Sequence, residues 1–158
     1  MKICRARMLR LTSIMAASCF VFILAPDLLA DGTLSGTTHS TLISPCNNEI
    51  VTGSVQFLIV VQTNQTATGP HVVALRNFQG TLQDSGGNEY QIQSTSHAEF
   101  DALSSSYTFP VTDHVVGVGQ GSSLSFSGTG TVTVFVDGNQ NPTGYRSHIN
   151  SLVCGVGN

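Results

Sequence analysis

The sequence predicts an all-β protein, folded as an antiparallel up-and-down meander of about six long strands. From Cys46 onward, stretches of alternating or β-branched residues are separated by short clusters rich in Gly, Ser, Asn and Asp. Such short connections join neighbouring antiparallel strands as hairpins. Helical periodicity is absent after residue 30. Long, hairpin-linked strands favour a closed barrel, which leaves no exposed edges, and the alternative is a sandwich of two sheets.

The expected strands form a single domain over residues 46–158, and they are residues 50–63, 71–83, 89–101, 107–119, 124–136 and 145–154. The first, third and fifth alternate between apolar and polar residues. Each of these should therefore have one face in the core and the other in water. The second and fourth carry apolar residues on both faces, which indicates that another element or a partner covers them.

Residues 1–30 have the pattern of a secretory signal peptide. Four of the six basic residues lie in the first ten positions, and an apolar run over residues 11–25 follows directly. A cut after Ala30 would leave residues 31–45 as a flexible, polar lead-in. We therefore expect a secreted protein, periplasmic or extracellular, that does not bind membranes after cleavage.

Two alternatives to a cleaved signal peptide stay open. The residues before Cys19 loosely resemble a lipoprotein processing site. An uncleaved anchor is the other alternative, but it needs ~20 apolar residues, and Pro26 and Asp27 interrupt the 19-residue stretch from Leu11 to Leu29.

Two cysteines, Cys46 and Cys154, remain after the predicted cleavage, and we expect them to form a disulfide. In a meander with an even number of strands, the first strand begins at the end of the barrel where the last strand finishes. Closure of the barrel would then bring the two cysteines together. The alternative is two unrelated thiols.

The charge of the chain excludes one class of partner. Residues 31–158 contain two arginines, no lysine and eight acidic residues, which gives a formal charge of −6, against −3 for the whole chain. Nucleic-acid binding requires a basic surface that neutralises phosphates. We therefore expect no nucleic-acid partner.

The sequence contains no recognisable catalytic or metal-binding motif. Its five histidines show neither the HxH nor the HExxH spacing, no CxxC motif is present, and no GxSxG nucleophile elbow occurs. Glu99 and Asp101 fit a solvated strand edge better than a glycosidase pair. Gly128 and Gly130 fall on the apolar face of their strand, where they allow either a bend or space for a ligand. We expect no metal, no cofactor and no enzymatic activity.

Arg76 and Asp113 are the candidate site. Each falls on the more apolar face of its strand, Arg76 in residues 71–83 and Asp113 in residues 107–119. A buried charge needs a partner, so the two can pair across the interior. Alternatively, Arg76 holds the carboxylate of a ligand, or its strand is shifted and Arg76 lies in solvent.

Several segments resemble small exported bacterial all-β proteins. They are Cys46-Asn47-Asn48-Glu49, His71-Val72-Val73, Asn77-Phe78-Gln79-Gly80 and the lone Cys154 of the last strand. This resemblance covers residues ~46–154 and implies no particular activity or ligand.

Two hypotheses for function follow. The first is a secreted β-barrel that binds a small apolar or carboxylated molecule in its interior, with Arg76 and Asp113 at the site. The second is a cell-surface or extracellular protein that works through protein contacts or as a structural component. An interior cavity that contains Arg76 favours the first, and a filled core with an exposed apolar patch favours the second.

Overall fold

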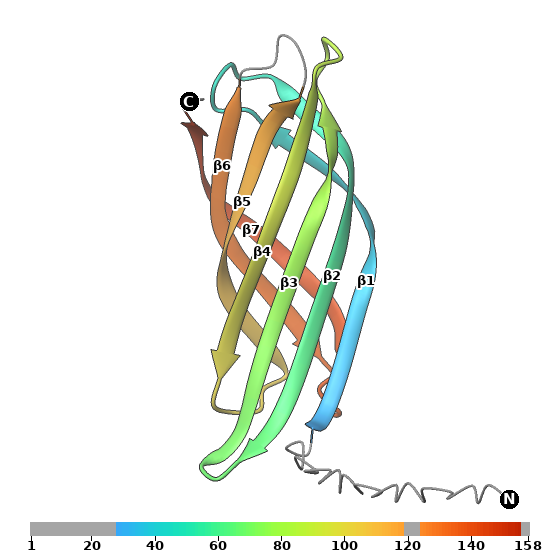
Figure 1. Ribbon diagram of the computed structural model, residues 1–158, viewed down its shortest axis with the longest axis vertical. Helices are drawn as coiled ribbons and strands as arrows, with labels where there is room; N and C mark the ends of the chain where they lie inside the picture. The colour runs from blue at the N-terminus through green and yellow to red at the C-terminus, as the bar shows by residue number, and fades with distance from the viewer. Residues whose placement is uncertain (1–27, 119–123, 156–158) are drawn as a thin grey trace, which may run out of the picture.

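The computed structural model describes residues 28–118 and 124–155, which form one sheet of seven antiparallel strands in sequence order (Figure 1). The strands are β1 Leu28–Ile43, β2 Ile50–Thr66, β3 Gly69–Gln83, β4 Glu89–Phe100, β5 Ser106–Val118, β6 Ser125–Val136 and β7 Pro142–Gly155. Within these ranges no helix is long and apolar enough to cross a membrane. The all-β meander is confirmed, but the predicted count of six strands is wrong.

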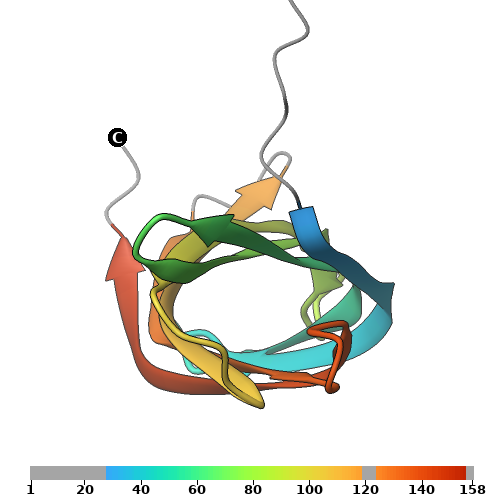
Figure 2. The same cartoon turned by 90° about the horizontal axis from the view of Figure 1, so that it is seen from below.

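The sheet curls strongly into a half-barrel that stays open (Figure 2). β1 and β7 are its two edges, and no ladder joins them in the described part of the chain. The two edges touch at one end, where a Cβ on Gly32 would overlap Pro142. The prediction of a closed barrel is therefore wrong. Seven is an odd number, so β1 and β7 run in the same direction, and closure would require a parallel ladder in an otherwise antiparallel sheet.

The seventh strand is the segment that we expected to be a flexible lead-in, residues 31–45. Most of it forms β1, which pairs with β2 in a continuous register from Ala30↔Thr63 to Ile43↔Ile50. Its sequence is mostly Thr, Ser and Gly, with few apolar residues to show an alternation. Pairing with a well-patterned neighbour decides the conformation of such an edge segment. Residues 1–27 of the predicted signal peptide lie outside the described residues.

The interior consists of two apolar clusters stacked along the strands. The disulfide-end cluster, against which Cys46 packs, contains Val51, Val55, Phe78, Leu82, Tyr90, Ile92, Val115 and Phe126. The far cluster contains Ile59, Val61, Val72, Ala74, Tyr107, Phe109, Val111, Val132, Val134 and Val136. Alternation along each strand sends these side chains inward.

The sheet is weakest between β4 and β5. These strands pair only from Glu89↔Val118 to Gln93↔His114. Beyond Gln93, β4 continues to Phe100 without a ladder partner in the described part of β5. The point at which the two strands diverge lies at mid-height, between the two apolar clusters.

A disulfide joins Cys46, in the connection between β1 and β2, to Cys154 in β7, with a Cα–Cα distance of 5.0 Å. The predicted pairing is therefore present. An even number of strands between the two cysteines was expected to bring them to the same end of the sheet. Six strands, β2 to β7, do follow Cys46, which lies just before β2. The bond links the β1–β2 connection to the edge strand β7 at one end of the open sheet. A disulfide is compatible with an oxidising extracellular or periplasmic environment.

Replacing both cysteines by serine should lower the free energy of unfolding by up to about 4.7 kcal/mol, the loop-entropy value for a closed loop of ~100 residues. The bond spans 108 residues. Urea unfolding of the Cys46→Ser/Cys154→Ser variant measures the loss. The wild-type protein under reducing conditions is the matched control and should unfold at the same urea concentration as the variant. Equal stability of oxidised wild-type protein and variant would show that the bond does not constrain the unfolded chain.

Two hairpin loops share one capping arrangement. Asp84 Oδ1 accepts hydrogen bonds from the backbone N–H groups of Gly86 and Asn88, each at 2.9 Å. Asp137 Oδ1 accepts the equivalent bonds from Asn139 and Asn141, also at 2.9 Å. In each loop one residue has a positive φ, Gly87 at 82° and Gln140 at 63°. Both aspartates therefore act as turn caps.

The cap at Asp84 makes the stability of the fold depend on pH. Hydrogen bonds, first from the side chain of Asn88 and also from Tyr90, lower the pKa of Asp84 from 3.8 to about 2 despite opposing desolvation. A carboxylate whose pKa is lowered by folding stabilises the folded protein at pH values above its ordinary pKa. This contribution is lost as the pH falls from about 4 towards 2.

Asp84→Asn should therefore reduce the acid sensitivity of unfolding over this pH window. Urea midpoints measured at pH 5 and pH 2.5 should differ less in the variant than in the wild-type protein. Asp101→Asn, at a fully exposed carboxylate, is the matched control and should keep the wild-type pH dependence. Parallel losses for wild type and Asp84→Asn would contradict the assignment.

Candidate functional site

A cavity of about 290 Å³ opens between the two edge strands, β1 and β7. Its mouth is formed by residues 38–42 of β1 and by Tyr145, Ser147 and Ile149 of β7. Its inner wall consists of Arg76, Phe78, Ile92 and Asp113, from β3, β4 and β5. The cavity exists because the sheet is open, since a ladder between β1 and β7 would seal this wall.

Arg76 and Asp113 form an ion pair at the inner wall. Arg76 Nη1 donates hydrogen bonds to Asp113 Oδ1 and to Ser94 Oγ, each at 2.9 Å. Only 1% of the Arg76 side chain and 14% of the Asp113 side chain are exposed. The guanidinium also lies 4.3 Å from the centroid of the Phe78 ring, in cation–π contact. The predicted pairing across the interior is therefore present, and the alternative of a solvated Arg76 is wrong.

The ion pair lies where β4 and β5 diverge. Ser94 directly follows the last paired residue of β4, and Asp113 directly precedes the last paired residue of β5. Arg76, on the adjacent strand β3, thus bridges the two strands from inside. Along β3, Ala74 belongs to the far cluster and Phe78 to the disulfide-end cluster. The ion pair therefore forms a polar layer between the two apolar clusters.

Within the described residues only the Nη1 nitrogen of Arg76 donates hydrogen bonds, so the donors on Nε and Nη2 remain unused. The buried Nε atom has no partner among the described residues. A buried donor without an acceptor costs ~1–3 kcal/mol, and the incompletely paired Arg76 guanidinium in the cavity wall therefore favours an additional acceptor, such as a ligand oxygen.

Tyr145 lies at the mouth of the cavity. Its ring packs against Phe57 with a centroid distance of 4.8 Å. Burial raises the pKa of the Tyr145 phenol, while the nearby Arg76 charge opposes this shift. Tyr145 therefore narrows the entrance between the two edge strands.

The inward-facing glycines of β6 do not enlarge the cavity. A Cβ on Gly130 would overlap the backbone carbonyl of His148, and one on Gly128 would meet the Leu152 side chain at 2.9 Å. β7 comes close to β6 here because the register shifts between Thr129 and Gly130. These glycines therefore permit close strand packing at a bulge, rather than ligand space.

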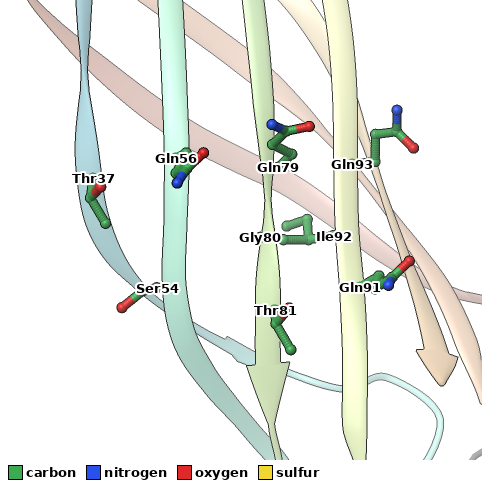
Figure 3. A pocket seen from close by; sticks show the side chains of 9 residues that line it. All are labelled: Thr37, Ser54, Gln56, Gln79, Gly80, Thr81, Gln91, Ile92 and Gln93. Carbon is green, nitrogen blue, oxygen red and sulfur yellow. The ribbon is translucent and has the colours of Figure 1, made fainter. Parts of the chain in front are cut away.

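The outer face of the sheet carries a larger hollow of about 580 Å³, over β1–β4 (Figure 3). Gln56, Gln79 and Gln93 form a cross-strand row there, because Gln56 pairs with Gln79 and Gln79 with Gln93. These side chains are exposed and uncharged. They contain no buried or unsatisfied group that would select a ligand, so the smaller interior cavity is the better candidate.

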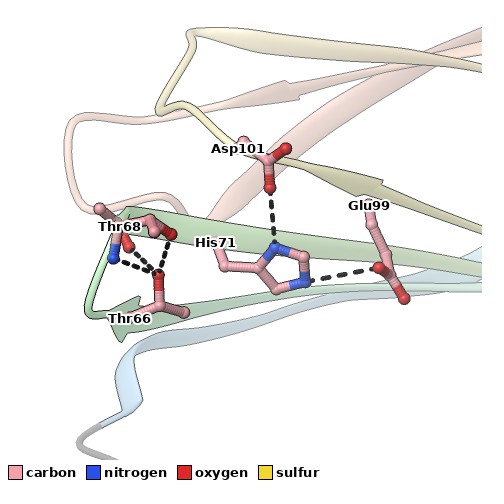
Figure 4. A network of polar contacts seen from close by, with 6 residues as sticks. Thr66, Thr68, His71, Glu99 and Asp101 are labelled. Carbon is pink, nitrogen blue, oxygen red and sulfur yellow. Dashed lines mark hydrogen bonds and ion pairs between the residues drawn. The ribbon is translucent and has the colours of Figure 1, made fainter.

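His71 lies between two carboxylates near the β2–β3 turn (Figure 4). Its Nδ1 is 3.2 Å from Asp101 and its Nε2 is 3.6 Å from Glu99. The carboxylates are 99% and 62% exposed, respectively. Water screens such surface pairs, which contribute ~0–1 kcal/mol. Within residues 28–118 and 124–155, no group of His, Cys, Asp and Glu side chains could hold a metal ion.

Comparison of the chain with protein-family models, with curated proteins and with solved structures found no match.

The sequence identified Arg76 and Asp113 but missed their neighbours. Ser94 could have been found, since it follows Tyr90 and Ile92 on the inward face of β4 as a polar residue in an apolar series. Tyr145 was assigned to a strand without any role. The contribution of β1 to the mouth was missed because that segment was expected to be flexible.

Arg76→Ala should lower the free energy of unfolding by about 3–5 kcal/mol, because it leaves Asp113 without its partner in a largely buried position. The double variant Arg76→Met/Asp113→Leu should recover part of this loss. Arg146→Ala, at an exposed arginine of β7, is the matched control and should change stability by less than about 0.5 kcal/mol. Urea unfolding measures all three. A loss for Arg76→Ala as small as that for Arg146→Ala would contradict a structural role of the ion pair.

Proposed function

We propose that this protein is a binding module that takes a small, largely apolar molecule into the cavity between β1 and β7. The observation that carries the proposal is the buried, incompletely hydrogen-bonded Arg76 in the wall of that cavity. Apolar pockets with a few polar groups that fix the orientation of a ligand are typical of small-molecule sites. The cavity of about 290 Å³ is at the lower end of their size range.

The proposed binding module acts outside the cytoplasm. The disulfide and the signal-peptide pattern of residues 1–30 support this location. No enzymatic activity is part of the proposal.

Filling the mouth of the cavity should abolish binding. Ile149 lines the cavity and is 40% exposed, so Ile149→Trp places a larger side chain in the opening without disturbing the inner wall. Titration of the protein with ethylbenzene, followed by NMR, should shift the resonances of Phe78 and Ile92 in the wild type and not in this variant.

The matched control for Ile149→Trp is Val153→Trp, on the same strand, at an exposed residue that does not line the cavity. This variant should bind ethylbenzene like the wild type. Shifts that persist in Ile149→Trp would place the probe elsewhere. Native mass spectrometry of the purified protein is the complementary search for a natural ligand.

The second candidate function is an extracellular interaction protein that uses the free edge of β7. Every residue from Arg146 to Ser151 is exposed, on both faces of the strand. An exposed strand edge is a template for pairing with another chain. Light scattering combined with crosslinking would distinguish the candidates, because this function requires a stable complex, whereas the binding module does not.

A further inference from the structure

We infer that the ligand of this cavity is a neutral molecule with a carbonyl oxygen on a compact apolar body. This inference rests on the proposed binding function and specifies its ligand class. It uses three features of the inner wall: the unused donors of Arg76, the charge balance of the ion pair, and the size and apolar lining of the cavity.

The unused donors of the Arg76 guanidinium set the polar group of the ligand. Arg76 Nη1 is occupied by Ser94 and Asp113, whereas Nε and Nη2 have no hydrogen-bond partner among the described residues. An arginine N–H can only donate, so the complementary group must accept a hydrogen bond. A carbonyl oxygen accepts without adding a donor that would itself need a partner.

The neutral charge of the Arg76–Asp113 pair argues against a ligand carboxylate, which was one of the alternatives that the sequence allowed. Arg76 is the only arginine that lines the cavity, and Asp113 at 2.9 Å already neutralises it. The other arginine of the described residues, Arg146, is exposed and does not line the cavity. His39 lies at the exposed rim, hydrogen-bonded to Thr52. A ligand carboxylate would therefore bring a second negative charge to a neutral, buried pair, which is costly.

The remaining lining sets the size and the polarity of the ligand body. Phe78 and Ile92 belong to the disulfide-end cluster, and with Leu42, Tyr145 and Ile149 they form the apolar part of the lining. The polar part on the edge strands consists of Thr38, His39, Ser40, Thr41 and Ser147. A volume of about 290 Å³, at ~30 Å³ for each water-sized unit, holds about ten non-hydrogen atoms. The site thus fits a small ketone, ester or amide.

Three probes of similar size test this inference: acetophenone, which is neutral and has a carbonyl group, benzoate, which is charged, and ethylbenzene, which has no acceptor. Titration of the protein at pH 7, followed by NMR at the resonances of Phe78 and Ile92, gives each dissociation constant. We expect acetophenone to bind at least about tenfold more tightly than either of the others, since a hydrogen bond to a charged group contributes about 1.5–3 kcal/mol.

The matched variants are Arg76→Lys and Arg146→Lys. Arg76→Lys keeps the positive charge and removes the unused Nε and Nη2 donors of the guanidinium, so it should abolish the preference for acetophenone over ethylbenzene while ethylbenzene still binds. Arg146→Lys should keep the preference. A second measurement does not depend on folding of the variant: the ¹³C carbonyl resonance of labelled acetophenone should move downfield on binding, as it does when the oxygen accepts a hydrogen bond.

The outcomes separate this inference from the proposed function. Benzoate binding as tightly as acetophenone would overturn the neutral class. Equal binding of acetophenone and ethylbenzene, or an unshifted carbonyl resonance, would overturn the contact with Arg76. Each of these results leaves cavity binding intact. If none of the three probes shifts the cavity resonances, the proposed function itself fails.

Discussion

The ion pair between Arg76 and Asp113 is the interaction on which the interior of this protein depends. It lies between two apolar clusters that alone would form one continuous core. Removing one partner would leave the other charge unpaired and largely buried, at a cost of about 3–5 kcal/mol. That cost is a large share of the ~5–15 kcal/mol by which a typical domain is stable. The same pair fixes the positions of β3, β4 and β5 at the point where the sheet begins to separate.

The two edges of the half-barrel are held together near both ends. At one end the disulfide joins the β1–β2 connection to β7, beside the disulfide-end cluster. At the other end Gly32 of β1 lies against Pro142 of β7. Between these two points no ladder joins β1 to β7 in the described part of the chain. An open sheet therefore keeps a defined cavity, because the edges are fixed at its ends while the seam between them stays free of backbone pairing.

Much of this architecture could be predicted from the sequence because side-chain alternation and short turns are local signals. The six strands from β2 to β7 follow from them. The disulfide follows from the two remaining cysteines and the even number of strands between them. The inward position of Arg76 was one of the alternatives that the alternation left open. β1 could not be predicted in this way, because its Thr, Ser and Gly residues form a strand only by pairing with β2. The openness of the barrel depends on that extra strand, and so the mouth of the cavity was also missed. Tyr145 and Thr38 line the same cavity only in three dimensions.

The burial of Arg76 also affects how the protein would meet proteases. Beyond the first ten residues the chain has no lysine and two arginines, Arg76 and Arg146, so a trypsin-like enzyme has two bonds to attack there. One of them follows a side chain that is 1% exposed, within a central strand. The other lies in a strand that is already hydrogen-bonded along one side. Cleavage requires an extended, accessible backbone, which folded strands provide only after local opening. A compartment rich in such enzymes would therefore degrade this protein only as fast as its sheet opens.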